Sequence, residues 1–466
     1  MADAEDLQVS RMLDGADALA GRVASFIDQV ADDADQVELW ACQERRRGVR
    51  LGDDGPLEPD RQGVGIRVWR DGLLGEAAVD SLDPADWHRG IAAALASLAP
   101  TDIPPPPPPT ARRPAPSVMD PALPEVLDQQ DLLVRLPQAL VDNVRHEAER
   151  IPGLGHVDGR VEYLARHRVV GNTGGVLTET LGELRCVVEL DGRFGECVRV
   201  IHVPDSFLHF ALMGARSWRT MPRVAADPLP GLRERMDVML HPRVLEALLR
   251  RGLADLLTEG EAVGGPRFPE GELIADPAVT LVDDPGLDGL ARSRAFDDEG
   301  TATRRTALLI RGRMTQHLRG RVAAERTGRP ATGAMARRGR AGLAPYQAAP
   351  TPAFSCLLME RGQPQFHDLV EDSSQLIVVH ALGGDLAVDP VTTAFSVTIR
   401  WGTLLEAGVA PRELAAGRWR LTGHLLSLAS HDGLLNEIVP SRDALDTGTG
   451  ILPYARAPLW VEAIEP

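Results

Sequence analysis

A proline-rich segment limits what this chain can fold into more than any other feature of the sequence. Residues 100–124 carry no apolar periodicity and include six consecutive prolines at 104–109. Proline fixes φ and lacks a backbone N–H, so such a run forms a polyproline II rod that cannot donate the hydrogen bonds of a helix or a sheet. We predict a semi-rigid spacer between domains, although the composition also suits a ligand of an SH3-type domain.

The residues before the spacer predict a small α/β domain. Residues 5–31 repeat apolar side chains at helical spacing. Strand-like segments follow at 37–44 and 63–80, and the second of them contains a turn at Asp71-Gly72. Asp83-Pro84 has the form of a helix start and predicts a helix that runs to residue 99.

The residues after the spacer predict a larger unit that is rich in strands. Helices are expected at 131–151, 205–217, 242–258 and 408–416, and hairpin turns at Arg311-Gly312, Arg361-Gly362 and Gly383-Gly384. A chain of 466 residues is too long for one ordinary core. We therefore predict an α+β protein with an N-terminal α/β domain at 1–99, a linker at 100–128, a middle α/β segment at 129–236 and a large, mostly antiparallel β-rich domain at 237–466.

Charge and hydropathy exclude several classes of protein. The net charge is −17, and every one of the 50 basic residues is an arginine. Nucleic acids and anionic membranes attract basic proteins, so we expect neither as a partner. The N-terminus has no basic and apolar signal-peptide pattern, and no apolar run approaches the roughly 20 residues that span a bilayer. We expect a cytoplasmic protein.

The four cysteines do not predict a disulfide framework or a zinc site, since none lies in a CxxC pair or beside a histidine. A two-residue turn at Asp191-Gly192 would place Cys186 opposite Cys197 in a hairpin. Two reduced thiols side by side are the favoured interpretation in a reducing cytosol. A disulfide between them is the alternative.

Several blocks of the C-terminal half together resemble the TldD/PmbA family. The block FDDEGTATRR at 296–305 is similar to the family's FDDEGTPTQR, and the hairpin ALLIRGRMTQHL follows it as in the family. Further similar blocks are DVMLHPRVLEALL at 237–249, LIVVHALGGDLAVDP at 376–390 and GRWRLTGHLLSL at 417–428. Each block alone is a weak signal, but the combination is specific.

The resemblance also indicates which type of family member this chain is. Catalytic members carry HExxxH at the start of a helix and a cysteine near the C-terminus, and together these hold zinc. Here the motif falls on residues 241–246, where His241 is kept, Pro242 replaces the glutamate and Glu246 replaces the second histidine. The last cysteine is Cys356, well before the C-terminus. The resemblance therefore implies no catalytic residues and no metal in this chain, with a His241/Glu246 metal pair as the alternative.

Other catalytic patterns are absent from the sequence, which contains no HExxH, no GxSxG, no P-loop and no GxGxxG after a strand. The glycines within 171–175 predict a turn and not a phosphate loop. By the resemblance, we expect six residues to face a chamber or a peptide: His241, Asp298, Glu299, Arg304, Gly383 and Gly384. The acidic pair could also bind a cation, but capped turns and salt bridges are the more common role of such residues.

The resemblance implies a function for the whole chain. We expect a metal-free, TldE/PmbA-like subunit of a heterodimeric metallopeptidase that cleaves unfolded or modified peptides, including leader peptides of natural products. The zinc is then expected in a TldD-like partner subunit. One alternative is a self-sufficient hydrolase with a degenerate site at His241 and Glu246. Another is a peptide-binding modulator that works without a partner.

Overall fold

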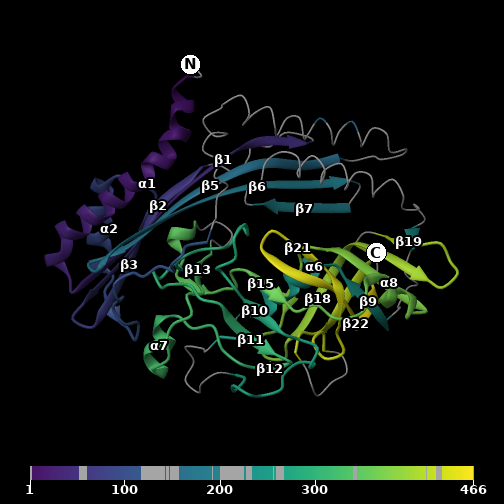
Figure 1. Cartoon of the computed structure of the whole chain (residues 1–466). Coiled ribbons are helices and arrows are strands. Elements are labelled where there is room, and N and C mark those ends of the chain that lie inside the picture. The colour runs from purple at the N-terminus through teal and green to yellow at the C-terminus, as the bar shows by residue number, and fades with distance from the viewer. Residues whose placement is uncertain are drawn as a thin grey trace.

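A computed structural model of the chain describes residues 3–51, 60–116, 142, 146, 157–190, 193–199, 225–226, 233–254, 257–258, 267–338, 344–415, 417–426 and 433–464. Figure 1 shows a long twisted sheet with helices on one side, and a second, β-rich part that lies beneath the far end of this sheet. The α+β class, with a small N-terminal region and a large β-rich C-terminal domain, is confirmed. Among the helices in these ranges, none combines the length and the apolar character that crossing a bilayer requires.

The first sheet is antiparallel, in the order β4-β3-β2-β1-β5-β6-β7. Its strands are β1 (Gln36–Leu51), β2 (Arg61–Arg70), β3 (Leu73–Val79), β4 (Ala99–Pro100), β5 (Val157–Asn172), β6 (Gly175–Leu190) and β7 (Arg193–Arg199). Helices α1 (Asp3–Val30) and α2 (Pro84–Ala96) pack against it, joined to the strands by turns and the short helix η1 (Ala31–Asp33). Phe26 of α1 meets Trp87 of α2 edge to face, with ring centroids 5.3 Å apart, so aromatic contact joins both helices in one apolar core.

Local sequence signals explain these elements. The side chain of Asp83 accepts a hydrogen bond from the backbone N–H of Ala85, which caps α2 as the Asp-Pro signal predicts. Asp71 and Gly72 both have positive φ, 53° and 75°, as a two-residue hairpin turn requires. The predicted turn near 171–175 is also confirmed, because Thr173 and Gly174 connect β5 to β6.

The predicted cysteine register is confirmed. Leu190 pairs with Arg193 and Cys186 with Cys197 across β6 and β7, although the turn at Asp191-Gly192 itself lies outside the described residues. The backbone therefore brings the two cysteines opposite each other. Whether their thiols join stays a prediction.

The proline-rich segment lies against both parts of the molecule. Gln36 and Asn172 of the first sheet donate side-chain hydrogen bonds to the carbonyls of Pro106 and Pro107. A little further along, the backbone N–H of Thr110 donates to the Gly300 carbonyl at 2.8 Å. This segment also links two neighbouring strands, because β1 before it pairs along its length with β5 after it. The first sheet thus contains strands from both sides of the linker that we predicted at 100–128. The division of the chain into domains stays a prediction.

The second sheet has the order β12-β11-β10-β15-β22-β9-β16-β18-β19-β8, with β17, β20 and β21 attached at its side. Its strands are β8 (Ala225–Ala226), β9 (Arg233–Leu240), β10 (Leu281–Asp283), β11 (Thr306–Ile310), β12 (Arg313–Met314), β15 (Leu357–Met359), β16 (Gln375–Leu382), β17 (Ala387–Val388), β18 (Ala394–Glu406), β19 (Arg412–Leu414), β20 (Trp419–His424), β21 (Val439–Asp446) and β22 (Gly450–Ala463). Most neighbours are antiparallel, but β9 with β16, β15 with β22 and β8 with β19 are parallel.

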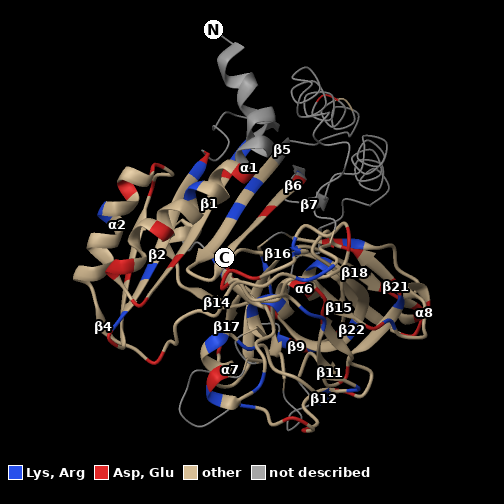
Figure 2. Cartoon of the chain, turned by 60° about the vertical axis from the view of Figure 1, so that its left-hand side comes forward, with Lys and Arg blue, Asp and Glu red and all other residues tan. Residues whose placement is uncertain are grey.

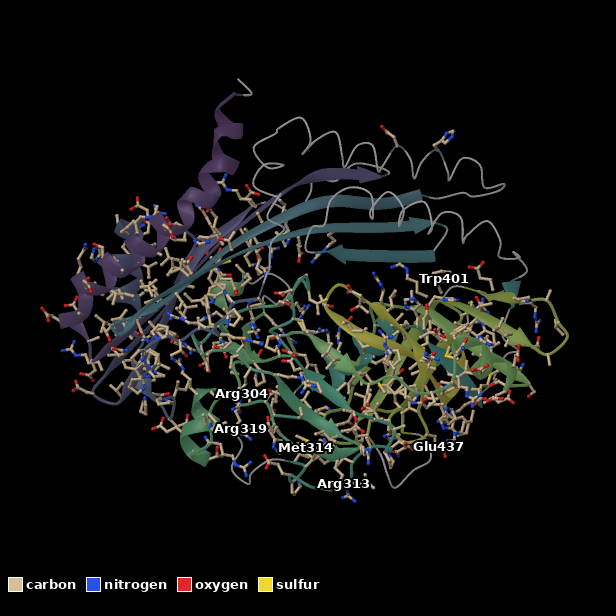
Figure 3. The ribbon with its side chains drawn as sticks, viewed as in Figure 1. Arg304, Arg313, Met314, Arg319, Trp401 and Glu437 are labelled. Carbon is tan, nitrogen blue, oxygen red and sulfur yellow. The ribbon has the colours of Figure 1, made fainter. Side chains whose placement is uncertain are left out.

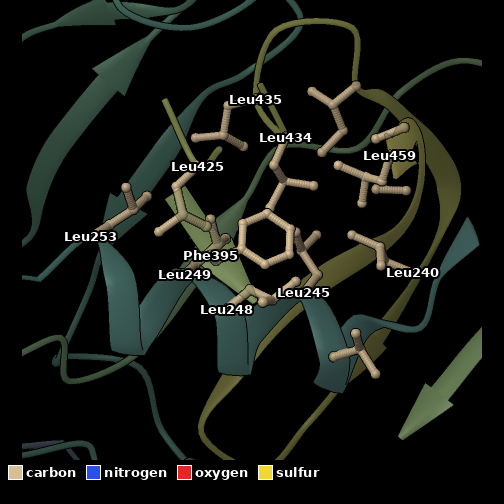
Figure 4. Close-up of a cluster of buried hydrophobic side chains, with 14 of the residues drawn as sticks. Leu240, Leu245, Leu248, Leu249, Leu253, Phe395, Leu425, Leu434, Leu435 and Leu459 are labelled. Carbon is tan, nitrogen blue, oxygen red and sulfur yellow. The ribbon is translucent and has the colours of Figure 1, made fainter. Parts of the chain in front are cut away.

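The remaining elements of this part are the helices α6 (Pro242–Gly252), α7 (Arg321–Thr327) and α8 (Phe366–Glu371), the short helix η2 (Pro345–Gln347), and the pair β13 (Met335–Arg337) and β14 (Pro350–Pro352). Figure 4 shows that α6 turns leucines such as Leu245 and Leu249 toward Phe395 of β18. These side chains are almost fully buried. This packing fixes the position of α6 relative to the sheet, which matters for the site below.

Two predicted elements of this half are wrong, and one is shorter than predicted. The helix expected at 408–416 is the strand β19, because Gly408 has a φ of 75° and Pro411 precedes the segment that pairs with β18. No hairpin turns at Arg361-Gly362, where the Gly362 N–H donates to the Ser441 carbonyl instead. The helix predicted at 242–258 ends at Gly252. The helix predicted at 205–217 lies outside the described residues, as does that at 131–151 apart from Asp142 and His146, which are helical.

Candidate functional site

A cavity of about 510 Å³ lies between the face of the first sheet and the C-terminal domain. Strands β5 and β6 form one wall, and α6 with the loops around residues 292, 354 and 448 forms the other. A cavity of this size falls within the range of pockets that take small ligands or a few residues of a peptide. Because side chains of a strand alternate between two faces, Arg166 and Arg168 both point to this side of β5.

The cavity is rich in arginine. Its lining includes nine arginines (Arg166, Arg168, Arg185, Arg243, Arg250, Arg292, Arg294, Arg337 and Arg338) and four carboxylates (Glu179, Glu183, Glu246 and Asp298). The lining therefore has an excess of five positive charges in a chain whose net charge is −17. Charged positions recur along the long strands in Figure 2.

One wall is organised by an ion pair on α6. Arg250 Nε donates to Glu246 Oε1 at 2.6 Å, and both side chains are about nine-tenths buried, with 12% and 7% exposed. The same guanidinium donates to the carbonyls of Phe354, Ser355 and Thr449 at 2.6 to 2.9 Å. Arg250 thus ties one turn of α6 to two loops.

One oxygen of the Glu246 carboxylate, Oε1, accepts two hydrogen bonds in this arrangement. Thr449 Oγ1 donates to Oε1 at 2.7 Å, in addition to the bond from Arg250. Burial alone would raise the pKa of Glu246, but the charge of Arg250 and the hydroxyls of Thr447 and Thr449 hold that pKa below its ordinary value. Glu246 is therefore an ionised partner of an arginine.

His241 lies in different surroundings from Glu246. Its Nδ1 accepts the backbone N–H of Arg243 at 3.3 Å, which caps α6, and its ring meets Tyr454 edge to face with centroids 5.2 Å apart. Burial lowers the pKa of His241 to about 3, so the imidazole is neutral. Pro242 occupies the first helical position, where a missing N–H costs nothing.

These residues do not fit the zinc site of a peptidase. Such a site needs three protein ligands and a general base. Here one position of the motif is Pro242, Oε1 of Glu246 accepts from both Arg250 and Thr449, and His241 caps its own helix. In the ranges that the structure describes, no three His, Cys, Asp or Glu side chains gather as metal ligands do.

A second set of charges joins the cavity wall to the first sheet. Asp298 Oδ1 accepts hydrogen bonds from Trp40 Nε1 at 3.1 Å and from Arg168, and Oδ2 accepts the backbone N–H of Arg337 at 2.6 Å. Burial would raise the pKa of Asp298, but the charges of Arg168 and Arg294 hold it below its ordinary value. Asp298 lines the cavity and is held rigidly there.

Glu299 points the other way, into a buried cluster with Arg321 and Glu38. Its Oε2 accepts the backbone N–H of Arg321 at 2.9 Å, and the Arg321 guanidinium donates to Glu38 at 2.7 Å. Burial raises the pKa of Glu299 to about 7. Since Glu38 belongs to β1, this cluster fastens the first sheet to the loop at 296–300.

The structure places the six predicted chamber-facing residues in separate environments. Asp298 alone of them lines the cavity. Arg304 donates to the Pro330 carbonyl, and Figure 3 shows it near α7. Gly383 and Gly384 lie in the turn between β16 and β17, where the Gly383 N–H donates to the Thr398 carbonyl.

Sequence reasoning missed the arginines of the cavity. They come from five separate stretches of chain, so no spacing rule links them. A signal was present in the pairs Arg166/Arg168, Arg292/Arg294 and Arg337/Arg338, which recur in a chain that is acidic overall. Such pairs become informative only when the fold shows that they face the same space.

Comparison with known proteins supports one family. Residues 233–453 match the model of the PmbA/TldA metallopeptidase C-terminal domain. A metalloprotease of Methanocaldococcus jannaschii is 27% identical over 254 residues, which are 53% of this chain and 51% of that protein. A metalloprotease of Methanothermobacter thermautotrophicus is 30% identical over 152 residues, or 32% of this chain and 31% of that protein. The chain thus matches about half the length of the first of these curated relatives and about a third of the second.

The fold is similar to a solved structure along nearly its whole length. The crystal structure of TldE from Thermococcus kodakarensis superposes with a TM-score of 0.71 at 20% identity, and the match covers 95% of this chain and 100% of that one. At this identity the likeness concerns the fold. Residues 233–453 thus belong to the family of PmbA/TldA metallopeptidase C-terminal domains, and this match supports the resemblance of the chain to the TldD/PmbA family in the blocks around residues 241 and 296.

Proposed function

We propose that this chain is the metal-free subunit of a paired, TldD/TldE-type metallopeptidase that acts on unfolded or modified peptides in the cytoplasm. The observation that carries the proposal is the Arg250–Glu246 ion pair on the helix where catalytic relatives are expected to bind zinc. The Arg250 guanidinium balances the charge of the buried Glu246 carboxylate, so no metal ion is required to do so. A metal ion bound to Oε1 of Glu246 would have to displace both Arg250 and Thr449.

The paired arrangement gives such a subunit a role. An internal cavity against the first sheet can hold part of a substrate while a zinc-bearing partner performs the hydrolysis. A chamber closed by the two subunits would also exclude folded proteins, which limits the damage from a peptidase of low sequence specificity. Removal of leader peptides during natural-product biosynthesis is one use that we include in the proposal.

Reconstitution tests the proposal. A labelled, denatured protein is incubated with this chain, with a relative that carries intact HExxxH, and with both together. We expect hydrolysis to require the relative and to increase when this chain is added. Hydrolysis by this chain alone, sensitive to chelator, would contradict the proposal.

A matched variant separates the proposal from the self-sufficient hydrolase. His241→Asn keeps a good helix cap but removes the imidazole. We expect the activity of the mixture to be unchanged, because His241 caps α6 in our account. Loss of activity in this variant would favour a metal site that uses His241.

A further inference from the structure

The arginines of the cavity are not all balanced by the carboxylates beside them. Arg168 binds both Glu179 and Asp298, Arg185 binds Glu183, and Arg250 binds Glu246. These pairs use every carboxylate that lines the cavity. The surplus of positive charge therefore belongs to other arginines.

Arg243 and Arg292 carry part of this surplus. Arg243 is half-buried on α6, and Arg292 is exposed to the cavity from the loop that precedes residue 293. Within the part of the chain that the structure describes, neither guanidinium has a carboxylate at ion-pair distance. The charge of Arg250, together with burial and the charge of Arg338, lowers the pKa of Arg292 to about 9, against the opposing charges of Glu246 and Glu183.

Clustered positive charge without partners disfavours the empty cavity and favours an anionic ligand. Like charges confined between low-dielectric walls repel more strongly than charges in water. A carboxylate that binds between them gains charge-assisted hydrogen bonds, and arginine forms these in the bidentate geometry that suits a carboxylate. The acidic exterior of the chain at the same time repels polyanions such as nucleic acids.

The dimensions and walls of the cavity favour a peptide over a single small anion. About 510 Å³ exceeds what one phosphate or acetate fills, and unbalanced arginines lie on two separate elements, α6 and the loop at 291–294. Arg166 and Arg185, which pair with Glu44 and Glu183, bring further N–H groups to the opposite wall. Two or more carboxylates a few ångströms apart would engage both sides, and adjacent acidic side chains of a peptide provide this.

We propose that this cavity binds an acidic segment of a peptide, with its carboxylates paired to Arg243 and Arg292. The peptide nature of the ligand rests on the proposed function, whereas its negative charge follows from the arginines alone. The site thereby selects for acidic stretches among the peptides that enter the complex. The excess of arginine in the lining repels basic stretches, because Glu179 and Asp298 are already paired with Arg168.

Binding of defined peptides to the full chain tests this inference. A fluorescent oligoglutamate peptide is titrated by anisotropy, with oligoglutamine and oligolysine peptides of equal length as controls. We expect binding of oligoglutamate alone, weakened as salt rises from about 0.05 to 0.2 M because a partly open site is screened. Equal binding of oligoglutamine, or displacement of oligoglutamate by an equimolar amount of inorganic phosphate, would overturn the inference.

Variants assign the binding to the cavity. Arg243→Gln with Arg292→Gln should weaken oligoglutamate binding by about tenfold or more, as expected for the loss of two charge-assisted contacts. Arg361→Gln removes an exposed arginine outside the cavity and serves as the matched control. The double variant should keep its thermal unfolding midpoint, because the two side chains have no structural partner among the described residues. Unchanged affinity in the double variant would overturn the assignment.

This test is separable from the test of the proposed function. If oligoglutamate binds but the partner's activity does not increase, the proposed acidic-peptide site is supported and the proposed subunit role is contradicted. If the partner's activity increases but oligoglutamate does not bind, the proposed subunit role is supported and the proposed acidic ligand is contradicted.

Discussion

Replacement of Arg250 by methionine is the most informative perturbation of the structure. The side chain of methionine fills a similar volume but donates no hydrogen bonds. The change removes the bonds to three backbone carbonyls, at roughly 1 kcal/mol each, and leaves Glu246 as a buried carboxylate without its cation, for roughly 2 kcal/mol more. We expect a loss of about 5 kcal/mol, or a fall of about 10 to 20 °C in the unfolding midpoint of a domain of this size.

A second substitution shows whether the carboxylate is the cause. Glu246→Gln in the Arg250→Met background removes the unpaired charge while its amide oxygen still accepts from Thr449. We expect the double variant to regain about 2 kcal/mol of the loss. Arg251→Met, at the adjacent exposed position, is the control and should change stability by less than about 0.5 kcal/mol. The free energies of unfolding are measured with urea for all four proteins.

The reasoning would be refuted by an Arg250→Met variant as stable as the Arg251→Met control. It would also be refuted if zinc restored the stability of the Arg250→Met variant. In that case Glu246 would be a ligand that Arg250 merely blocks.

Three further predictions concern ionisable groups. Burial raises the folded-state pKa of Glu299 to about 7, so its contribution to stability is complete below its unfolded pKa and is lost as pH rises through 7. Unfolding of wild type and Glu299→Gln across pH 5 to 8 should show a smaller decrease for the variant, and parallel curves would contradict this. The lowered pKa of His241 has the opposite consequence. The contribution of His241 to stability is present above its unfolded-state pKa and is lost as pH falls toward 3. His241→Asn should therefore be less sensitive to acid between about pH 6.5 and 4, measured by thermal unfolding, and equal sensitivity would count against the buried neutral imidazole. Burial raises the pKa of Cys42 and Cys356 to about 12, so in a Cys186→Ser/Cys197→Ser background both thiols should react with a disulfide reagent only after denaturation. Rapid reaction of the native protein in that background would contradict their burial.

Much of the fold follows from local signals in the sequence. The Asp83-Pro84 cap, the Asp71-Gly72 turn and the register of Cys186 with Cys197 depend on residues near each other in the chain, and all three are confirmed. The wrong helix at 408–416 shows the limit of local patterns, because pairing with β18 and β8 decides the conformation of β19. The sequence also did not predict that the end of the proline-rich segment lies against Gly300, since this contact depends on a surface formed by residues far apart in the chain.

The candidate site was predictable only in part. The resemblance identified the helix at 242 and the loss of the zinc motif from Pro242 and Glu246 alone. It did not indicate that Arg250, one turn later, would complete an ion pair with Glu246 and bind two loops. Such contacts arise from tertiary packing, as do the positions of Arg243 and Arg292 in the lining of one cavity.

Native mass spectrometry tests the central claim most directly. This chain is co-expressed with a relative that carries intact HExxxH, and the mass and metal content of the complex are measured together with those of each chain alone. The account predicts a one-to-one complex that holds a single zinc ion, which remains with the relative when the subunits separate. A zinc-loaded oligomer of this chain by itself would contradict the account and make His241 and Glu246 metal ligands.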